Sequence, residues 1–158
     1  ERLLPECFQA GLSWRTILHK RENFRRAFDN FDAVKIAAYD EEKVASLLTD
    51  AGIVRNRLKV RGAVRNAKAF LRLVEENGTF AAWLWRFVDN APLLPAAPLT
   101  MELVPAETEI ARALSKALRK ADFTFVGPTI CYAFMQSVGM VDDHVVGCYK
   151  YRGPAEKN

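Results

Sequence analysis

The chain has no run of about eighteen consecutive apolar residues, the length that a membrane-spanning helix needs. Its first five residues lack the basic and then apolar order of a secretory signal. Only three cysteines occur in 158 residues, which is not the pattern of a disulfide framework. These absences predict a cytoplasmic protein with no membrane segment, folded as a single domain over residues 1–158 around a hydrophobic core.

Acidic residues are also missing from one stretch, residues 51–74, which Asp50 and Glu75 bracket. Seven basic residues lie within it: Arg55, Arg57, Lys59, Arg61, Arg65, Lys68 and Arg72. A local field of one sign suits a nucleic-acid backbone, although a solvated helix face has the same composition. The net charge of +4 does not decide between the two.

Apolar residues recur at helical spacing through most of the chain, so the sequence predicts an all-α fold. Helices are expected from residue 14 to about 20 and loosely on to 28, from 41 to Gly52, from 57 to Gly78, from 80 to 88, from about 106, and from Pro128 to Gly139. The third of these carries an apolar stripe: Val60, Val64, Ala67, Leu71 and Val74. Residues 91–105 contain four prolines and should form an ordered loop whose apolar side chains are covered.

Two of the expected helices flank a tight turn at Gly52, so residues of about 41–77 have the layout of a helix-hairpin-helix element. Backbone N–H groups of such a turn and of the following helix can bind a DNA phosphate. Arg55, Arg57 and Lys59 would strengthen that contact electrostatically. The alternative is that Gly52 is an ordinary helix cap between two packed helices.

Near the beginning of the chain, residues 6–14 read ECFQAGLSW. This segment resembles the pocket motif of the bacterial 3-methyladenine DNA glycosylase I family, within the helix-hairpin-helix superfamily. Further blocks occur in the order of that family and extend the resemblance to about Gly153: residues 20–24, 50–57, 114–118, 125–136 and 143–148. The resemblance implies a helix-hairpin-helix DNA glycosylase bundle that hydrolyses the N-glycosidic bond of 3-methyladenine in alkylated double-stranded DNA, working as a monomer.

The same resemblance assigns roles residue by residue. Glu6 corresponds to the glutamate that contacts the base and serves catalysis, and Trp14 to the tryptophan that stacks on it. Leu12 corresponds to the leucine that fills the gap left by the extruded nucleotide. Without the resemblance, Glu6 would be read as a solvated charge, Trp14 as a core aromatic and Leu12 as a loop anchor.

His144 and Cys148, in an H-x₃-C spacing, resemble half of the family's structural zinc site. The resemblance implies a closed tetrahedral site that fastens a tail of about residues 140–153. The family's other two ligands, a cysteine and a histidine, precede the glutamate motif in a segment that this chain does not contain. Structural zinc is therefore expected with two of its four ligands present here.

Two other functions are compatible with the same residues. The chain could be a non-catalytic helix-hairpin-helix domain that binds DNA through Arg55, Arg57 and Lys59. It could also be a bifunctional glycosylase in which Lys59 is the nucleophile of a lyase reaction. Asp89, the first aspartate after the hairpin, is where many glycosylases of the superfamily activate water, but the resembled family lacks that aspartate.

Overall fold

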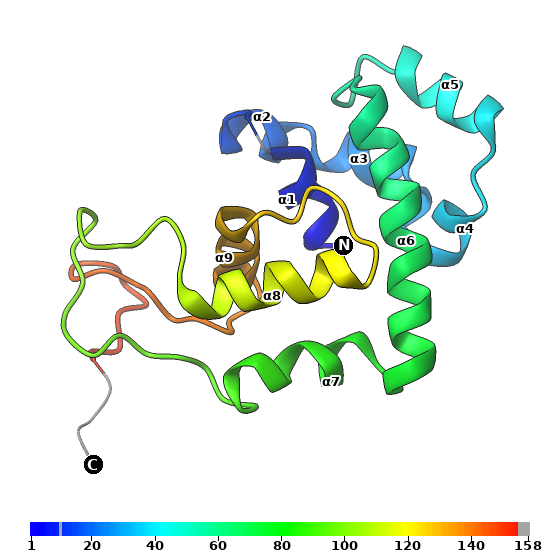
Figure 1. Cartoon of the computed structure of the whole chain (residues 1–158). Coiled ribbons are helices and arrows are strands. Elements are labelled where there is room, and N and C mark those ends of the chain that lie inside the picture. The colour runs from blue at the N-terminus through cyan, green and yellow to red at the C-terminus, as the bar shows by residue number, and fades with distance from the viewer. Residues whose placement is uncertain (10, 155–158) are drawn as a thin grey trace.

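The computed structural model describes residues 1–9 and 11–154, so Ala10 of the pocket motif lies outside the described residues. The α-helices are α1 (Leu3–Gln9), α2 (Trp14–His19), α3 (Arg21–Ala27), α4 (Ala33–Ala37), α5 (Glu41–Thr49), α6 (Arg57–Asn77), α7 (Phe80–Trp85), α8 (Glu109–Lys120) and α9 (Pro128–Ser137). Two 3₁₀ helices, η1 (Asp29–Phe31) and η2 (Arg86–Val88), join them. Over this part of the chain no strand is present, and the predicted all-α class is confirmed (Figure 1).

Side-chain caps explain where several helices begin. Asp40, Asn56 and Thr79 each accept a hydrogen bond from a backbone N–H in the first turn of α5, α6 and α7. Such caps satisfy amides that have no partner within the helix, which fixes the first residue. The predicted starts at residues 41, 57 and 80 are confirmed. Pro128, whose missing N–H costs nothing in a first turn, begins α9 as predicted.

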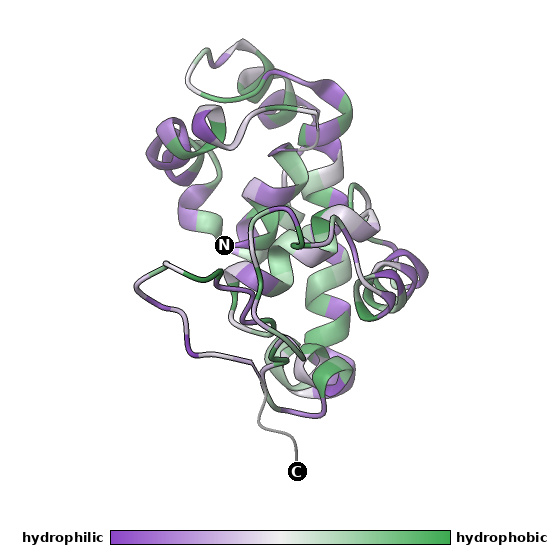
Figure 2. Cartoon of the chain, turned by 90° about the vertical axis from the view of Figure 1, so that its left-hand side faces the viewer, coloured by the Kyte–Doolittle hydropathy of each residue, from purple (hydrophilic) through white to green (hydrophobic). Residues whose placement is uncertain are grey.

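Helix α6 runs through the molecule and packs into two hydrophobic clusters (Figure 1). The N-terminal cluster contains Phe8, Ile17, Phe24, Phe28, Ile36, Val44, Leu47, Ile53, Val60, Ala63 and Ala67. The C-terminal cluster contains Cys7, Ala69, Leu73, Leu84, Val88, Ala111, Leu114, Leu118, Phe123, Val126, Cys131, Tyr132, Phe134, Met135, Met140 and Val141. Apolar residues accordingly line the inner sides of the helices, with polar ones outside, as the colouring in Figure 2 shows.

The single apolar stripe predicted for α6 is partly wrong. Val60 and Ala67 are buried as expected, but Val64, Leu71 and Val74 are only half-buried. In their place α6 buries Ala63, Ala69 and Leu73. The reason is that α6 contributes side chains to two clusters on different sides of the helix. A single stripe therefore does not describe its buried residues.

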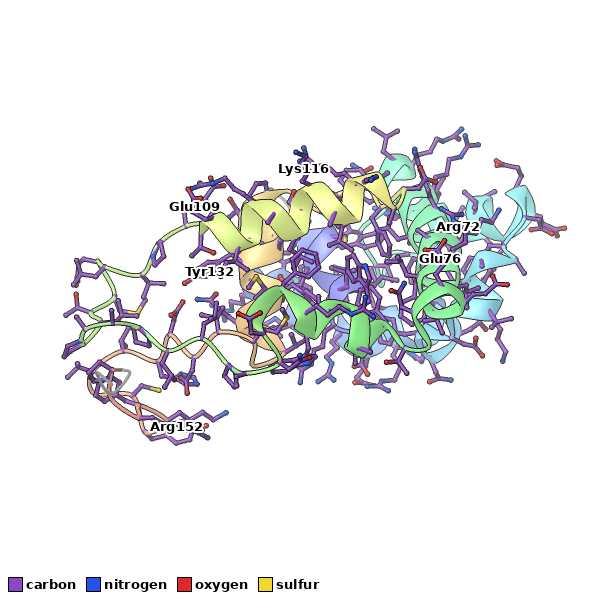
Figure 3. The ribbon with its side chains drawn as sticks, turned by 60° about the horizontal axis from the view of Figure 1, so that its bottom comes forward. Arg72, Glu76, Glu109, Lys116, Tyr132 and Arg152 are labelled. Carbon is purple, nitrogen blue, oxygen red and sulfur yellow. The ribbon has the colours of Figure 1, made fainter. Side chains whose placement is uncertain are left out.

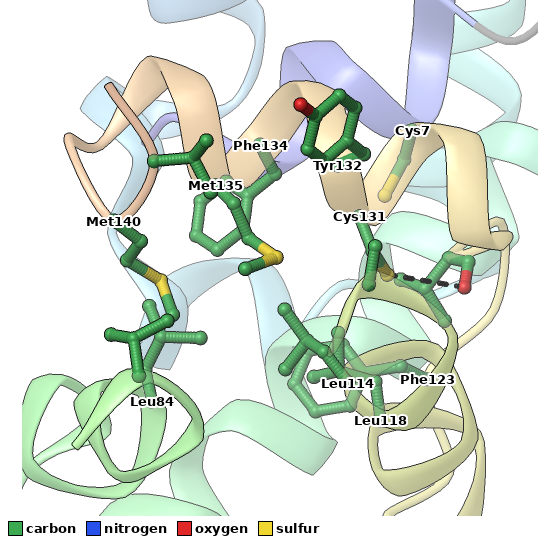
Figure 4. Close-up of a cluster of buried hydrophobic side chains, with 14 of the residues drawn as sticks. Cys7, Leu84, Leu114, Leu118, Phe123, Cys131, Tyr132, Phe134, Met135 and Met140 are labelled. Atoms are coloured by element: carbon green, nitrogen blue, oxygen red, sulfur yellow. Dashed lines mark hydrogen bonds between the residues drawn. The ribbon is translucent and has the colours of Figure 1, made fainter. Parts of the chain in front are cut away.

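Helix α1 lies between the two clusters and contacts α2, α6 and α9. Consecutive residues of α1 belong to different clusters, because Cys7 packs into the C-terminal cluster and Phe8 into the N-terminal one. Figure 4 shows Cys7 near Cys131 of α9, above Leu114 and Leu118 of α8. A helix of only seven residues is therefore held from both sides.

The expected end of α5 and the expected start of α8 differ from the structure, and one helix was not expected. α5 ends at Thr49 with Asp50 as its cap, so Gly52 does not end that helix. α8 begins at Glu109 and not at about residue 106, since Thr108 accepts from Ala111 N. The sequence pattern also missed α4, whose five residues are too few to show a period.

The proline-rich loop, residues 91–105, lies alongside the tail and is hydrogen-bonded to it. Leu93 N donates to Met140 O and Val146 N to Leu99 O, each at 2.9 Å. The expected cover of its apolar side chains is wrong for three of them, since Leu94, Met101 and Leu103 are exposed. Figure 3 shows the tail reaching away from the helices to Arg152. Among the described residues no helix is long and apolar enough to cross a membrane.

Candidate active site

Glu6 is a buried acid in the middle of α1, with 2% of its surface exposed. Its Oε2 atom is buried without a hydrogen-bond partner among the described residues. Burial raises the pKa of Glu6 to about 7, an effect that the Ser137 hydroxyl and the charge of Arg2 offset in part. A carboxyl group kept buried with a free acceptor atom costs stability, which marks Glu6 as a functional candidate.

Glu6 and Trp14 line the same cavity, which has a volume of about 390 Å³. That volume lies within the usual range of small-ligand pockets. The cavity has walls from α1, from α2 and Arg21, and from α9, whose lining residues are Ala133, Gln136 and Ser137. The structure therefore brings together the two residues that the pocket motif singled out.

The contribution of α9 to this cavity is not evident from the sequence. Ala133, Gln136 and Ser137 are spaced i, i+3, i+4, so they share one face of a helix. The block that carries the family resemblance includes two of them, but nothing in the sequence places that face against α1. The contact between α1 and α9 is a tertiary one that only the fold supplies.

Leu12 lies in the turn between α1 and α2. Gly11 adopts a φ of +78°, a conformation that favours glycine, and Leu12 N donates to Gln9 O at 2.6 Å. The Gln9 amide returns a hydrogen bond to Leu12 O at 2.7 Å, and Ser13 then caps α2. This turn leaves Leu12 and Trp14 each 37% exposed. Leu12 is absent from the cavity wall and stands beside it on the surface.

The turn at Gly52 is held by side chains from α3 and its cap. Lys20 Nζ donates to Ala51 O at 2.9 Å, and Asn23 Nδ2 donates to Gly52 O at 3.2 Å. A Cβ atom at Gly52 would lie 2.9 Å from Asp50 Oδ1 and 3.2 Å from Asn23, so the turn has no room for a side chain. Gly52 is required by close approach and not as a left-handed helix cap.

Arg55 and Arg57 follow this turn and are exposed, as a DNA contact requires. Lys59 is different, since it is only 8% exposed and its Nζ donates to Phe8 O at 2.8 Å. The expectation that Lys59 joins the exposed basic surface of the hairpin is wrong. Lys59 lines a separate cavity across α1 and is absent from the wall of the cavity that holds Glu6.

The rest of the basic stretch is partly neutralised by acids far away in the sequence. Arg61 pairs with Glu41 at 2.6 Å, while Arg65 and Arg72 both pair with Asp122. Arg72 is labelled on α6 in Figure 3. The field of one sign read from residues 51–74 is therefore weakened in the fold at Arg61, Arg65 and Arg72, of which the last two share one carboxylate.

His144 and Cys148 lie side by side in the tail, with Nδ1 and Sγ 3.6 Å apart. Gly147, at φ +90°, permits the turn between them, in which Cys148 N donates to Val145 O. Across the described part of the chain, no group of three or more potential metal ligands is found. Asp89 lies exposed at the end of η2, away from the Glu6 cavity.

A cavity lined by a buried acid and a tryptophan suits an enzyme that receives an extruded base, which such enzymes bind by hydrogen bonds and by stacking. Comparison with known proteins agrees. A family model described as methyladenine glycosylase matches residues 1–151. The chain is 48% identical over 153 residues to DNA-3-methyladenine glycosylase 1 of Escherichia coli (strain K12), covering 97% of this chain and 81% of the relative. The chain belongs to the methyladenine glycosylase family.

Other relatives give the same result. The DNA-3-methyladenine glycosylase of Haemophilus influenzae is 44% identical over 148 residues, covering 94% of this chain and 80% of the relative. A crystal structure of 3-methyladenine DNA glycosylase I has a TM-score of 0.89 at 46% identity, covering 95% of this chain and 82% of that one. The Staphylococcus aureus enzyme, solved for its recognition of 3-methyladenine, has a TM-score of 0.90 at 30% identity, covering 99% and 81%.

Proposed function

We propose that the cavity between Glu6 and Trp14 is where this chain, a DNA-3-methyladenine glycosylase like its relatives, receives the base extruded from alkylated double-stranded DNA. The observation that carries the proposal is the buried Glu6, which lines the same cavity as Trp14 and whose Oε2 has no hydrogen-bond partner among the described residues. The relatives are named as enzymes, which supports this function over a non-catalytic DNA-binding domain.

The chemistry follows from the charge of the substrate. Methylation at N3 gives the adenine a positive charge in DNA and so weakens its bond to the sugar. Trp14 stacks on the cationic ring, and ionised Glu6 accepts a hydrogen bond from the adenine edge. As the C1′–N9 bond breaks, its electron pair passes to N9, so the base leaves neutral and positive charge develops on the sugar, where the nearby Glu6 carboxylate stabilises it. Water then adds its oxygen to C1′ and releases a proton to the solvent.

Two further elements hold the DNA. Leu12, whose carbonyl accepts from the Gln9 side-chain amide, is exposed two residues before the cavity-lining Trp14 and fills the space that the extruded nucleotide vacates. The hairpin binds the phosphate backbone through the amides after Gly52 and through Arg55 and Arg57. Contacts of this kind position a protein on DNA without reading sequence, which suits an enzyme that searches for damage.

A structural zinc ion fits the pair in the tail. With Zn–S near 2.3 Å and Zn–N near 2.0–2.1 Å, two ligands of a tetrahedral site are about 3.6 Å apart. His144 Nδ1 and Cys148 Sγ have that separation. These two residues would hold the ion, which would fasten the tail and take no part in the reaction. Zinc content measured on the purified protein and on C148S tests this; equal content in both would contradict it.

The decisive experiment compares the parent with E6Q and W14A on methylated duplex DNA, measuring released 3-methyladenine under single-turnover conditions. We expect E6Q to lower the rate at saturating enzyme by about 10²-fold, the loss typical for one electrostatic contact in a catalytic site. DNA affinity should change little, because neither residue contacts the backbone. Release by E6Q at the parent rate would overturn the role of Glu6.

A further inference from the structure

Lys59 is a buried cation whose place in the fold the reaction does not explain. It is the third residue of α6, directly behind the exposed hairpin arginines. The backbone N–H of Lys59 donates to Asn56 Oδ1 at 3.1 Å, so the backbone of Lys59 is part of the first turn of the hairpin's second helix. Its side chain instead points inward, and burial lowers the pKa of its ammonium group.

The ammonium meets the end of α1. Phe8 lies in the last turn of that helix, where backbone carbonyls have no partner within the helix. Lys59 Nζ donates to Phe8 O at 2.8 Å, across 51 residues of sequence. A cation at a helix C-terminus is also favoured by the helix dipole. Lys59 thus caps the helix that carries Glu6.

Asn66 reinforces the same contact two turns further along α6. Its Nδ2 lies 3.6 Å from Cys7 Sγ and donates to Thr124 O at 3.0 Å, while its Oδ1 accepts from Thr124 N at 2.7 Å. At i and i+7, Lys59 and Asn66 share one face of α6. One face of α6, the second helix of the hairpin, therefore contacts Cys7 and Phe8, the two residues that follow Glu6.

We propose that Lys59 is a positioning residue, which ties the hairpin to α1 and so sets where Glu6 and Leu12 stand relative to the DNA backbone. The inference rests on the proposed function of Glu6. Arg55 and Arg57 bind the DNA phosphates. Lys59 lies two residues after Arg57 and donates a hydrogen bond to Phe8 O. Phe8 is in turn two residues from Glu6 and four from Leu12. Misplacement of a reacting group by about 1 Å can cost 10²-fold in rate.

The test compares K59M with the parent, with E6Q and with the double variant R55A/R57A. Methionine keeps the volume of the buried stem and removes the donor and the charge. We expect K59M to bind methylated duplex within about twofold of the parent and to release base about 30-fold more slowly at saturating enzyme. R55A/R57A should differ from K59M in its binding, with weaker affinity for the duplex and a smaller dependence of that affinity on salt.

A double-mutant cycle separates positioning from general stability. If Lys59 acts by placing Glu6, then K59M should slow base release little further in the E6Q background. Its effect on thermal unfolding should persist in that background, because the Phe8 contact is lost in either case. If K59M does not fold, K59Q tests the hydrogen bond directly: its amide can still donate to Phe8 O, so base release near the parent rate supports positioning, and a loss as large as that of E6Q contradicts it.

Three outcomes would overturn the proposal. Full additivity of K59M and E6Q would reduce Lys59 to a stabilising contact. Weaker DNA binding with an unchanged saturated rate would make it a phosphate ligand. Trapping of a borohydride adduct that K59M abolishes would make it a nucleophile. Failure of the proposed function itself looks different, because E6Q would then release base at the parent rate.

Discussion

The hydroxyl of Tyr132 in α9 donates a hydrogen bond to Oδ2 of Asp143 in the tail. Gln136 Nε2, one helical turn further on, donates to the same oxygen at 3.3 Å. Asp143 is half-buried, and desolvation raises the pKa of its carboxyl. The residue that precedes His144 is thus fixed to the helix that also lines the Glu6 cavity.

Removing the Tyr132 hydroxyl should therefore loosen the tail. Y132F leaves a partly buried carboxylate with only the Gln136 amide, and we expect a loss of about 1–2 kcal/mol in the free energy of unfolding. Urea denaturation measures it. The matched control is Y149F, because Tyr149 is 91% exposed and that change should be neutral. Equal effects of the two would show that the Asp143 contact contributes nothing.

Glu6 should destabilise the folded protein at neutral and alkaline pH. Its pKa rises from 4.5 to about 7 on folding, so the protonated acid is favoured in the folded state. Its contribution is therefore most favourable below pH 4.5 and is lost as pH rises through about 7. E6Q, neutral at every pH, should be about 3 kcal/mol more stable than the parent at pH 8.

The advantage of E6Q should fade as pH falls below 4.5, where Glu6 becomes protonated in the unfolded state as well as in the folded one. Denaturation of both proteins across pH 4–8 tests this. Glu76, exposed on α6 (Figure 3), offers the control, since E76Q should show no pH-dependent gain. A gain of E6Q that is constant with pH would mean that ionisation of Glu6 is not its cause.

Excision should respond to the same titration in the opposite direction. Only ionised Glu6 offers negative charge to the cationic base, so kcat/KM should rise with pH through about 7, the value for the free enzyme. E6Q should lack this limb, although its rate is lower throughout. Base release from methylated duplex between pH 5.5 and 8.5 gives both profiles. Identical pH profiles for the two proteins would contradict an essential Glu6 carboxylate.

Local signals explain which elements the sequence predicts well. Asp40, Asn56 and Thr79 fix helix starts through their own side chains, and Pro128 does so through its ring. Such signals need only neighbouring residues. The start of α8 is not predicted correctly, because its cap, Thr108, lies just beyond a proline-rich loop that shows no helical periodicity.

Contacts distant in sequence explain the errors. Arg65 is read as a free charge because its partner, Asp122, is 57 residues away. Lys59 is read as a phosphate ligand because Phe8 O, its acceptor, belongs to a helix that only the fold places there. The pocket motif named Glu6 and Trp14, yet the cavity that they line is completed by Ala133, Gln136 and Ser137 of α9, which only the fold places there.

The turn at Gly52 offers the sharpest test of the hairpin. A methyl group there would lie 2.9 Å from Asp50 Oδ1, the atom that accepts from Gly52 N at 2.7 Å, and would press on Asn23. G52A should therefore displace the turn, cost about 1–3 kcal/mol and weaken duplex binding. G127A is the matched control, because the nearest atom to its Cβ is an Arg119 nitrogen at 3.9 Å. If G52A binds duplex as tightly as G127A does, the turn is not the phosphate-binding element, and Arg55 and Arg57 must hold DNA without its amides.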